Sequence, residues 1–169
     1  MASAYDVPLV FQQQNPICWM ACLAMIDSYW TNSSVGIGKF SGGFDPSDSS
    51  IPNPGKDWPD FERRMKGFGF YPDDPGKPLT LAAVSSLLDE CGPLAFIHTV
   101  TNGQPWKPAG GSGSHAVVIT AADASTRMLR INNPWGTKDA WYGASVVLPC
   151  AVTPSSRYAI FYKTGGMSQ

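Results

Sequence analysis

The sequence predicts an α+β fold in which helices come first and strands follow. Helical signals gather in the first 92 residues, whereas apolar runs rich in β-branched residues gather after residue 93. Such a separation is typical of α+β proteins, since a doubly wound sheet would alternate the two kinds of element. The chain has 169 residues and can bury a proper core. We therefore expect a single domain over 1–169, with a helical half at about 1–92 and a β half at about 93–169.

The first helix is predicted to carry an apolar run, residues 17–30, that has almost no polar side chain. Such a composition indicates a central helix that is buried over most of its circumference. Asn15 is a favoured N-cap and Pro16 a favoured first helical residue, which would place Cys18 in the first turn. Cys22 follows one turn later, and Cβ atoms at that spacing lie about 5–6 Å apart, farther than a disulfide needs. We expect these two thiols to stay separate.

The later elements follow from caps and β-branched runs. The stretch 31–56 is rich in Gly, Ser, Pro and Asn, so it is either disordered or a binding surface. Two more helices are predicted at about 57–66 and 80–91, the second opened by a threonine N-cap and each closed by a glycine. Strands are predicted over 94–100, 115–122, 127–132, 145–150 and 157–163.

Cys18 is a candidate nucleophile. A cysteine attacks carbonyls as thiolate, and its ordinary pKa of about 8.5 must be offset by a helix N-terminus or an adjacent imidazolium. The first turn of a helix supplies partial positive charge and N–H groups, which can also stabilise an oxyanion. A lone cysteine is more often a buried structural residue. We expect that of Cys22, Cys91 and Cys150, and the residues described next set Cys18 apart.

Of the two histidines, His115 is the candidate general base. It follows a Gly/Ser-rich segment, 109–114, and opens a β-branched run, so it marks a strand end beside a loop, where catalytic side chains are commonly carried. His98 falls within the predicted strand 94–100, and nothing nearby in the sequence orients it. We expect His98 to be a strand histidine near the surface or a satisfied polar group of the core.

A histidine base needs a partner that fixes its tautomer and ring orientation. Asp123 is eight residues along the same strand, about 26 Å away at about 3.3 Å per residue, and is excluded if the strand runs through. Asn132 and Asn133 end the next strand, and a neighbouring strand could bring either to the histidine. Asn133 is preferred because it shares side-chain parity with Leu129 and Ile131 and so points toward the interior.

The order of these residues, with Cys18-Trp19 and Asn133-Pro134-Trp135-Gly136, resembles the papain-like cysteine peptidases. The resemblance implies a triad of Cys18, His115 and Asn133, with Trp135 shielding the contact between histidine and asparagine. It also implies that Gln12, six residues before the nucleophile (18 − 12), donates its amide to the oxyanion beside the Cys18 N–H. Gln13 and Gln14 are neighbours that could be mistaken for Gln12.

The chain also departs from papain. Papain relatives carry a disulfide-forming cysteine at the position of Asn15. The histidine follows Cys18 by 97 residues (115 − 18) and the asparagine by 115 (133 − 18), against roughly 130–150 in papain and the cathepsins, so loops that shape papain's substrate pockets are expected to be missing. The motifs look closer to bacterial effector proteases and to the leader-cleaving domains of bacteriocin exporters. Those exporter domains usually have Asp-Cys-Gly at the nucleophile and an aspartate as the third residue of the triad. Here Ile17-Cys18-Trp19 and Asn133 occupy these places, which favours the effector branch.

Other chemistries fail on spacing. The cysteines and histidines do not form a metal-ligand cluster, and the Gly-rich segment 110–114 lacks the last glycine of a nucleophile elbow and the lysine of a phosphate loop. We therefore expect no metal and no cofactor. Aromatic side chains could wall substrate subsites, although loop aromatics more often pack locally. The candidates are Trp19, Trp106 and Trp135, with Trp141 and Tyr142 as further options.

Composition excludes several partners. A net charge of −1 and a sequence pI of about 6.0 give no electrostatic case for nucleic acid or an anionic membrane. No stretch is apolar enough to span a bilayer, and residues 1–14 lack the features of a secretory signal. Four cysteines without a signal suggest free thiols made in a reducing cytoplasm. A protein exported by a specialised machine into another cell would show the same features.

The sequence thus predicts a papain-like thiol protease that acts on proteins or peptides, as a bacterial effector or toxin with a cognate immunity or inhibitor protein. One alternative is an amidase or deamidase on the same scaffold, acting on peptidoglycan or a side-chain amide. Peptidoglycan-cleaving relatives usually carry a histidine as the third residue of the triad. The asparagine at position 133 therefore disfavours the peptidoglycan alternative. The same motifs would also suit a leader-processing peptidase, or a binding module that has lost catalysis.

Overall fold

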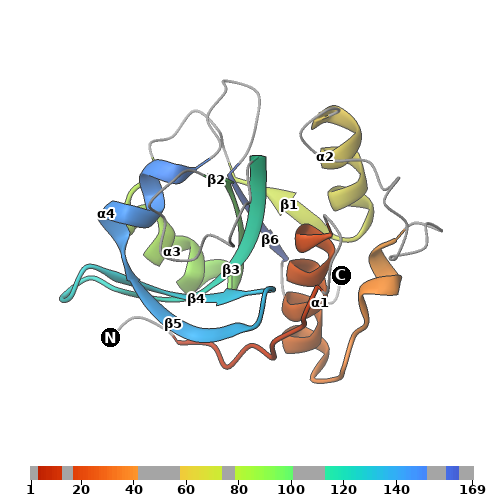
Figure 1. The fold of residues 1–169 in the computed structure, drawn as a ribbon, viewed down its shortest axis with the longest axis horizontal. Coiled ribbons are helices and arrows are strands. Elements are labelled where there is room, and N and C mark those ends of the chain that lie inside the picture. Colours follow the sequence, from red (N-terminus) through yellow and green to blue (C-terminus); the bar gives the residue numbers. More distant parts are fainter. Residues whose placement is uncertain are drawn as a thin grey trace.

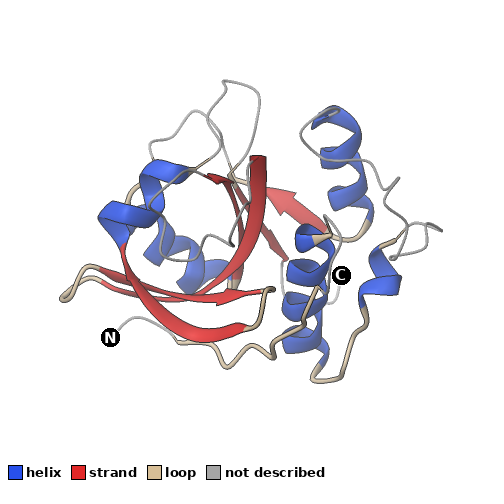
Figure 2. Cartoon of the chain, in the orientation of Figure 1, coloured by secondary structure: helices blue, strands red, loops and turns tan. Residues whose placement is uncertain are grey.

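The computed structural model describes residues 4–12, 17–41, 58–73, 79–100, 113–151 and 159–163. Figures 1 and 2 show helices placed around a strongly curved sheet. In chain order the elements are α1 (Cys18–Thr31), η1 (Ile37–Phe40), α2 (Trp58–Gly67), β1 (Phe70–Pro72), α3 (Leu81–Cys91), β2 (Leu94–Val100), β3 (Gly113–Asp123), β4 (Met128–Asn133), β5 (Thr137–Gly143), α4 (Ala144–Val147), η2 (Leu148–Cys150) and β6 (Ile160–Lys163).

The strands form one antiparallel sheet in the order β1-β6-β2-β3-β4-β5. The register shifts between Ile119 and Ala121 of β3 and between Ile131 and Asn133 of β4. Irregularities of this kind bend a strand and increase its twist. The sheet curves around α3, while α1 lies along the other side of β3 (Figure 1).

Alternate side chains of β3 serve two cores. Ala116 and Val118 belong to a buried cluster with α1, whereas Val117 and Ile119 belong to a second cluster with α3. Successive side chains of a strand point to opposite faces, so β3 separates the two cores. His115 shares parity with Val117 and therefore lies on the α3 face, at the end of the strand.

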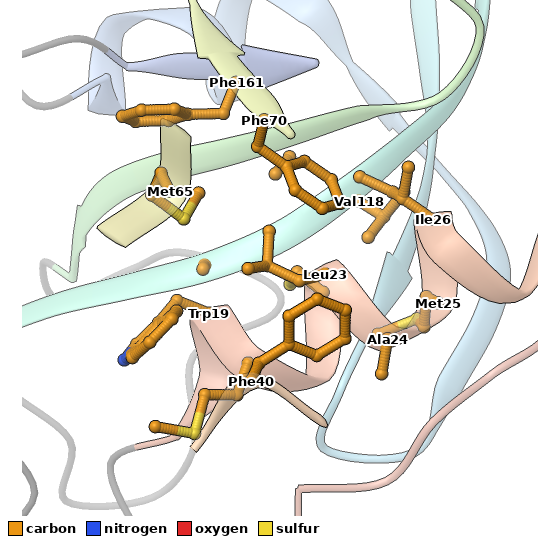
Figure 3. Close-up of a cluster of buried hydrophobic side chains, with 14 of the residues drawn as sticks. Trp19, Leu23, Ala24, Met25, Ile26, Phe40, Met65, Phe70, Val118 and Phe161 are labelled. Atoms are coloured by element: carbon orange, nitrogen blue, oxygen red, sulfur yellow. The ribbon is translucent and has the colours of Figure 1, made fainter. Parts of the chain in front are cut away.

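Helix α1 is buried from Trp19 through Ser28, as its apolar sequence predicts. Figure 3 shows Leu23 and Ile26 of α1 lying together with Val118 of β3. The fully buried Asp27 forms ion pairs with Lys39 and Lys163, which join α1 to η1 and β6. Helix α1 is thus anchored by its buried side chains along its length and by ion pairs near its C-terminal end.

The expected α+β class is confirmed, with a central helix packed on an antiparallel half-barrel. The helices expected at 57–66 and 80–91 are α2 and α3, and the Thr80 hydroxyl caps α3 by accepting the Ala83 N–H at 3.1 Å. The strand expected at 94–100 is β2. None of the described helices is both long and apolar enough to cross a membrane.

One expected strand was wrong, and two strands were not expected. Residues 145–150 form α4 and η2, because burial there follows a helical spacing: Ala144 and Val147 are buried whereas Val146 is 45% exposed. Strand β5 was not expected, since its half-exposed edge position needs no apolar alternation. Strand β1 also brings residues of the helical half into the sheet.

The polar stretch 31–56 is described only as far as residue 41. That part contains η1, and Phe40 is only 1% exposed in the core against Phe68 and Phe70. The described part is therefore ordered and contributes an aromatic side chain to the core.

Candidate active site

Cys18 is the first residue of α1, and its thiol is free and partly exposed. The N-cap is Ile17, which makes no side-chain hydrogen bond to the helix. The expectation that Asn15 caps the helix was therefore wrong, because the helix begins later; Asn15 and Pro16 lie outside the described residues. Cys18 still occupies the first turn, where backbone N–H groups point away from the helix and are available to an anion. All four cysteines are free, so Cys18 and Cys22 are not bonded.

His115 lies in β3, the strand that packs beside the first turn of α1. Its side chain is only 2% exposed, and the backbone of the next residue, Ala116, hydrogen-bonds to the Cys18 sulfur. Because α1 packs along β3, the helix tip lies beside the start of the histidine strand. Packing of the two elements therefore brings Cys18 beside the backbone of Ala116, the residue that follows His115.

Asn133 orients the His115 ring. Its Oδ1 lies 3.1 Å from His115 Nε2 and also accepts the Trp135 N–H at 3.1 Å. An amide oxygen can only accept, so Nε2 carries the hydrogen and the neutral ring keeps its lone pair on Nδ1. The site thus holds the tautomer in which Nδ1 can take a proton.

Asn132, the alternative partner, serves the framework. Its Nδ2 donates to the Val7 carbonyl at 2.9 Å, and its Oδ1 accepts the Asp139 N–H at 2.8 Å. The structure therefore brings Asn133 to the histidine, and Asn132 binds the segment before α1 instead.

Trp135 covers the imidazole. The two rings stack with centroids 3.6 Å apart and planes 6° apart, and His115 is buried beneath the indole. The turn that places Trp135 closes through the Gly136 N–H, which donates to the Asn133 carbonyl at 3.0 Å. Gly136 has φ +108, which side chains rarely adopt, so glycine is required there.

Gln12 lies against the same turn. It is 4% exposed, and its N–H donates to the Pro134 carbonyl at 2.9 Å. Phe11, which sequence reasoning missed, is 54% exposed, and its ring lies 3.6 Å from where a Cβ on Gly136 would be. The sequence signal that could have indicated Phe11 as a site residue is its position directly before Gln12. Gln13 and Gln14 lie outside the described residues.

Burial sets the charge states of the pair. Desolvation raises the pKa of Cys18 to about 11. Hydrogen bonds to the backbone of Ala116, Trp19 and Cys18 act in the opposite direction but are outweighed. Desolvation also lowers the pKa of His115 to about 3, against the raising effect of the Asn133 hydrogen bond. The sequence had predicted a thiol activated by the helix end, whereas here burial outweighs that effect. At neutral pH the Cys18 thiol is therefore protonated and the His115 ring is neutral.

The structure also brings His98 to the site. His98 lies directly opposite His115 in the β2–β3 register, is fully buried, and its ring centroid is 5.4 Å from that of His115. Of the two environments expected for this residue, the buried one is observed. The sequence reasoning saw nothing to orient His98 because the contact joins two strands.

The aromatic subsite candidates fall into different places. Trp19 is 4% exposed and packs edge-on against Phe61 at 5.3 Å, which leaves little surface for a substrate. Trp141 is 45% exposed on the edge strand β5, whereas Tyr142 packs partly into the core. Trp106 lies outside the described residues. Within the described residues, no three His, Cys, Asp or Glu side chains gather as metal ligands.

Two solved structures share this fold. A C39-like peptidase from Bacillus anthracis is 17% identical, with a TM-score of 0.62 over 96% of this chain and 97% of that chain. A double glycine motif protease from an AMS/PCAT transporter, in complex with the leader peptide, is also 17% identical, with a TM-score of 0.54 over 96% of this chain and 95% of that chain. At such identity the likeness shows the fold alone. A search of the curated proteins finds no match to the sequence.

The sequence itself matches a family model. Residues 1–145, which include the first turn of α1, the start of β3 and the turn after β4, match the family described as papain-like cysteine protease AvrRpt2. This range covers most of the chain and agrees with the resemblance read from Cys18, His115 and Asn133. The chain belongs to the papain-like cysteine protease AvrRpt2 family and is a cysteine peptidase.

Proposed function

We propose that the protein cleaves peptide bonds with Cys18 as nucleophile, His115 as general base and acid, and Asn133 as the orienting residue. The observation that carries the proposal is the buried bond from His115 Nε2 to Asn133 Oδ1, made while the Ala116 backbone holds the Cys18 sulfur. That arrangement fixes the ring with Nδ1 as the proton acceptor on the strand end that meets the helix tip.

In the first half-reaction, His115 Nδ1 takes the thiol proton as the Cys18 sulfur bonds to the substrate carbonyl carbon. The carbonyl π electrons move to oxygen, and the tetrahedral intermediate then expels the amine, which takes the proton from Nδ1. A thioester remains on Cys18. In the second half-reaction His115 deprotonates water, the hydroxide attacks the thioester carbonyl, and the sulfur leaves and recovers the proton as the carboxylic acid product departs.

The oxyanion is assigned to the Cys18 N–H and the Gln12 side-chain amide. Support comes from the position of Cys18 at the start of α1 and from the anchoring of Gln12 to the Pro134 carbonyl beside the site. Donors held in place before reaction are the largest single contribution in many acyl transfers. Trp135 and the exposed Phe11 ring next to it are the aromatic surfaces available to a peptide.

The proposed substrates are proteins or peptides of a target cell, with the enzyme acting as a bacterial effector or toxin. The family description supports a protease, and the solved structure of similar fold in complex with a leader peptide supports a peptide as the ligand. We also propose synthesis in the cytoplasm, export by a specialised machine, and a cognate inhibitor protein over the site. Leader-peptide processing is the alternative that this relative favours.

The test compares bacterial cells that express the wild type, Cys18→Ala or Cys91→Ala. Cys91 is a partly exposed thiol at the end of α3, so Cys91→Ala is a matched control. We expect new protein N-termini with the wild type and Cys91→Ala, and none with Cys18→Ala. A mass gain of deamidation without new N-termini would replace the protease by a deamidase. Growth arrest that depends on Cys18 supports the toxin role, and equal growth of all three strains would remove that role alone.

A further inference from the structure

His98 faces His115 across the sheet. In the antiparallel register of β2 and β3 the two residues are directly paired, so both side chains project from the same face. Their rings are perpendicular, with an interplanar angle of 88° and centroids 5.4 Å apart. Both residues are buried, at 0% and 2% exposure.

The contacts of His98 hold its own ring in one orientation. Its Nδ1 lies 3.3 Å from the Thr99 carbonyl, which can only accept, so Nδ1 carries the hydrogen. The ring stacks on Phe96 with an interplanar angle of 19°, and the His98 backbone forms a bridge to Ala151. A phenylalanine could keep the stacking, but it could not make the bond to Thr99.

His115 is consequently restrained from three directions. Asn133 holds Nε2 from β4, Trp135 covers one face, and His98 abuts the ring from β2. A single hydrogen bond would leave the ring free to rock about the line joining donor and acceptor, since the outer torsion of histidine is broad. Contacts from both neighbouring strands remove that freedom.

We propose that His98 is a positioning residue for His115: its fixed, perpendicular ring holds the general base in the orientation that serves Cys18. This role rests on the proposed triad and adds a residue to it. His98 itself touches no reacting atom.

The same geometry couples the charges of the two rings. Burial lowers the pKa of His98 to about 4, and a charged His98 lowers the pKa of His115 further. Cys18 of α1 lies at the backbone of Ala116, the residue after His115. Cys150 of η2 precedes Ala151, the bridge partner of His98, and its thiol donates to the Val146 carbonyl.

The first test uses the wild type, whose two histidines give two sets of signals after selective ¹⁵N labelling. We expect both rings to stay neutral well below pH 6, with the protonation of one visible in the titration of the other. Two independent single-site titrations near pH 6.5 would overturn the inference.

The second test follows Cys18 alkylation by iodoacetamide against pH in folded His98→Phe and His98→Asn, with Phe96→Leu as the packing control. Without the His98 charge, the pH below which the alkylation rate falls should rise by about 2 units. This is the shift expected for two unit charges 5.4 Å apart at an effective dielectric constant of about 20. The plateau rate should fall several-fold in both His98 variants, since the base is less restrained. Phe96→Leu should keep the wild-type dependence of alkylation rate on pH.

If both His98 variants keep the wild-type dependence of alkylation rate on pH and the wild-type maximal rate, His98 is a core residue without a positioning role. The proposed triad has a separate readout. If His115→Ala alkylates at the wild-type rate, the triad itself is wrong; if His115→Ala loses alkylation while the His98 variants keep it, only the positioning role fails.

Discussion

Replacing Asn133 by alanine removes the acceptor that orients His115, whereas the same change at Asn132 removes a framework contact. The two asparagines are adjacent and buried, at 3% and 0% exposure, so they form a matched pair. Asn133→Ala leaves His115 Nε2–H without its 3.1 Å acceptor. A buried donor left in this way costs about 1–3 kcal/mol.

If that cost falls on the reactive orientation, Cys18 reactivity should drop by about 5- to 150-fold, at about 1.4 kcal/mol per tenfold. Asn132→Ala loses bonds of 2.9 and 2.8 Å to Val7 and Asp139 and should destabilise the fold at least as much. Because neither bond involves His115, its alkylation rate should stay close to that of the wild type.

The assay measures the rate of Cys18 alkylation by peptide mass spectrometry, together with urea unfolding of each variant. It needs no knowledge of the substrate. Equal slowing of alkylation in the two variants, or an unchanged rate in Asn133→Ala, would refute the assignment of Asn133 to the histidine.

Three further predictions follow from the site and the core. Gln12→Ala should alkylate at Cys18 almost normally yet turn over substrate about 10²–10³-fold more slowly, since an oxyanion donor acts only after attack; normal turnover would contradict it. Alkylation of the wild type should be level across neutral pH, because the His115 pKa near 3 keeps the base neutral above it and the Cys18 pKa near 11 keeps the thiol below it; an acid limb at pH 6.5 would contradict it. Asp27→Asn should lower the free energy of unfolding by about 1.5–3 kcal/mol in urea without changing that profile, since it weakens only the ties to Lys39 and Lys163; an unchanged unfolding curve would contradict it.

The elements that carry the site were predictable because their signals are local. The apolar run of α1, the threonine cap of α3 and the β-branched start of β3 each determine an element without help from distant residues. Side-chain parity along β4 and the resemblance of 133–136 to the papain motif together led to the choice of Asn133, although Asn132 is also buried.

The features that were missed depend on distant contacts. The contact of His98 with His115 exists only through strand pairing, and strand β5 is defined by its partner β4 rather than by its own half-exposed sequence. The apolar residues at 145–150 suggest a strand, but they begin within the short helix α4, in which Ala144 and Val147, three residues apart, are the buried ones. The thiol pKa also depends on enclosure by residues far along the chain, so a helix-end argument alone gave its direction wrongly.

The most direct test of the account is the distribution of a limiting amount of iodoacetamide over the four cysteines at pH 5. Cys18 should be labelled first, and its rate should match that at pH 7, because His115 remains a neutral base at both values. The pKa values of Cys18, Cys22 and Cys91 are all raised. Cys22 and Cys91 should nevertheless react slowly, because the histidine base is assigned to Cys18 alone and Cys22 is fully buried. In His115→Ala the preference for Cys18 should vanish. Labelling of Cys18 that falls tenfold per pH unit in the wild type, or that survives in His115→Ala, would contradict the proposal that these two residues work as one acid–base pair.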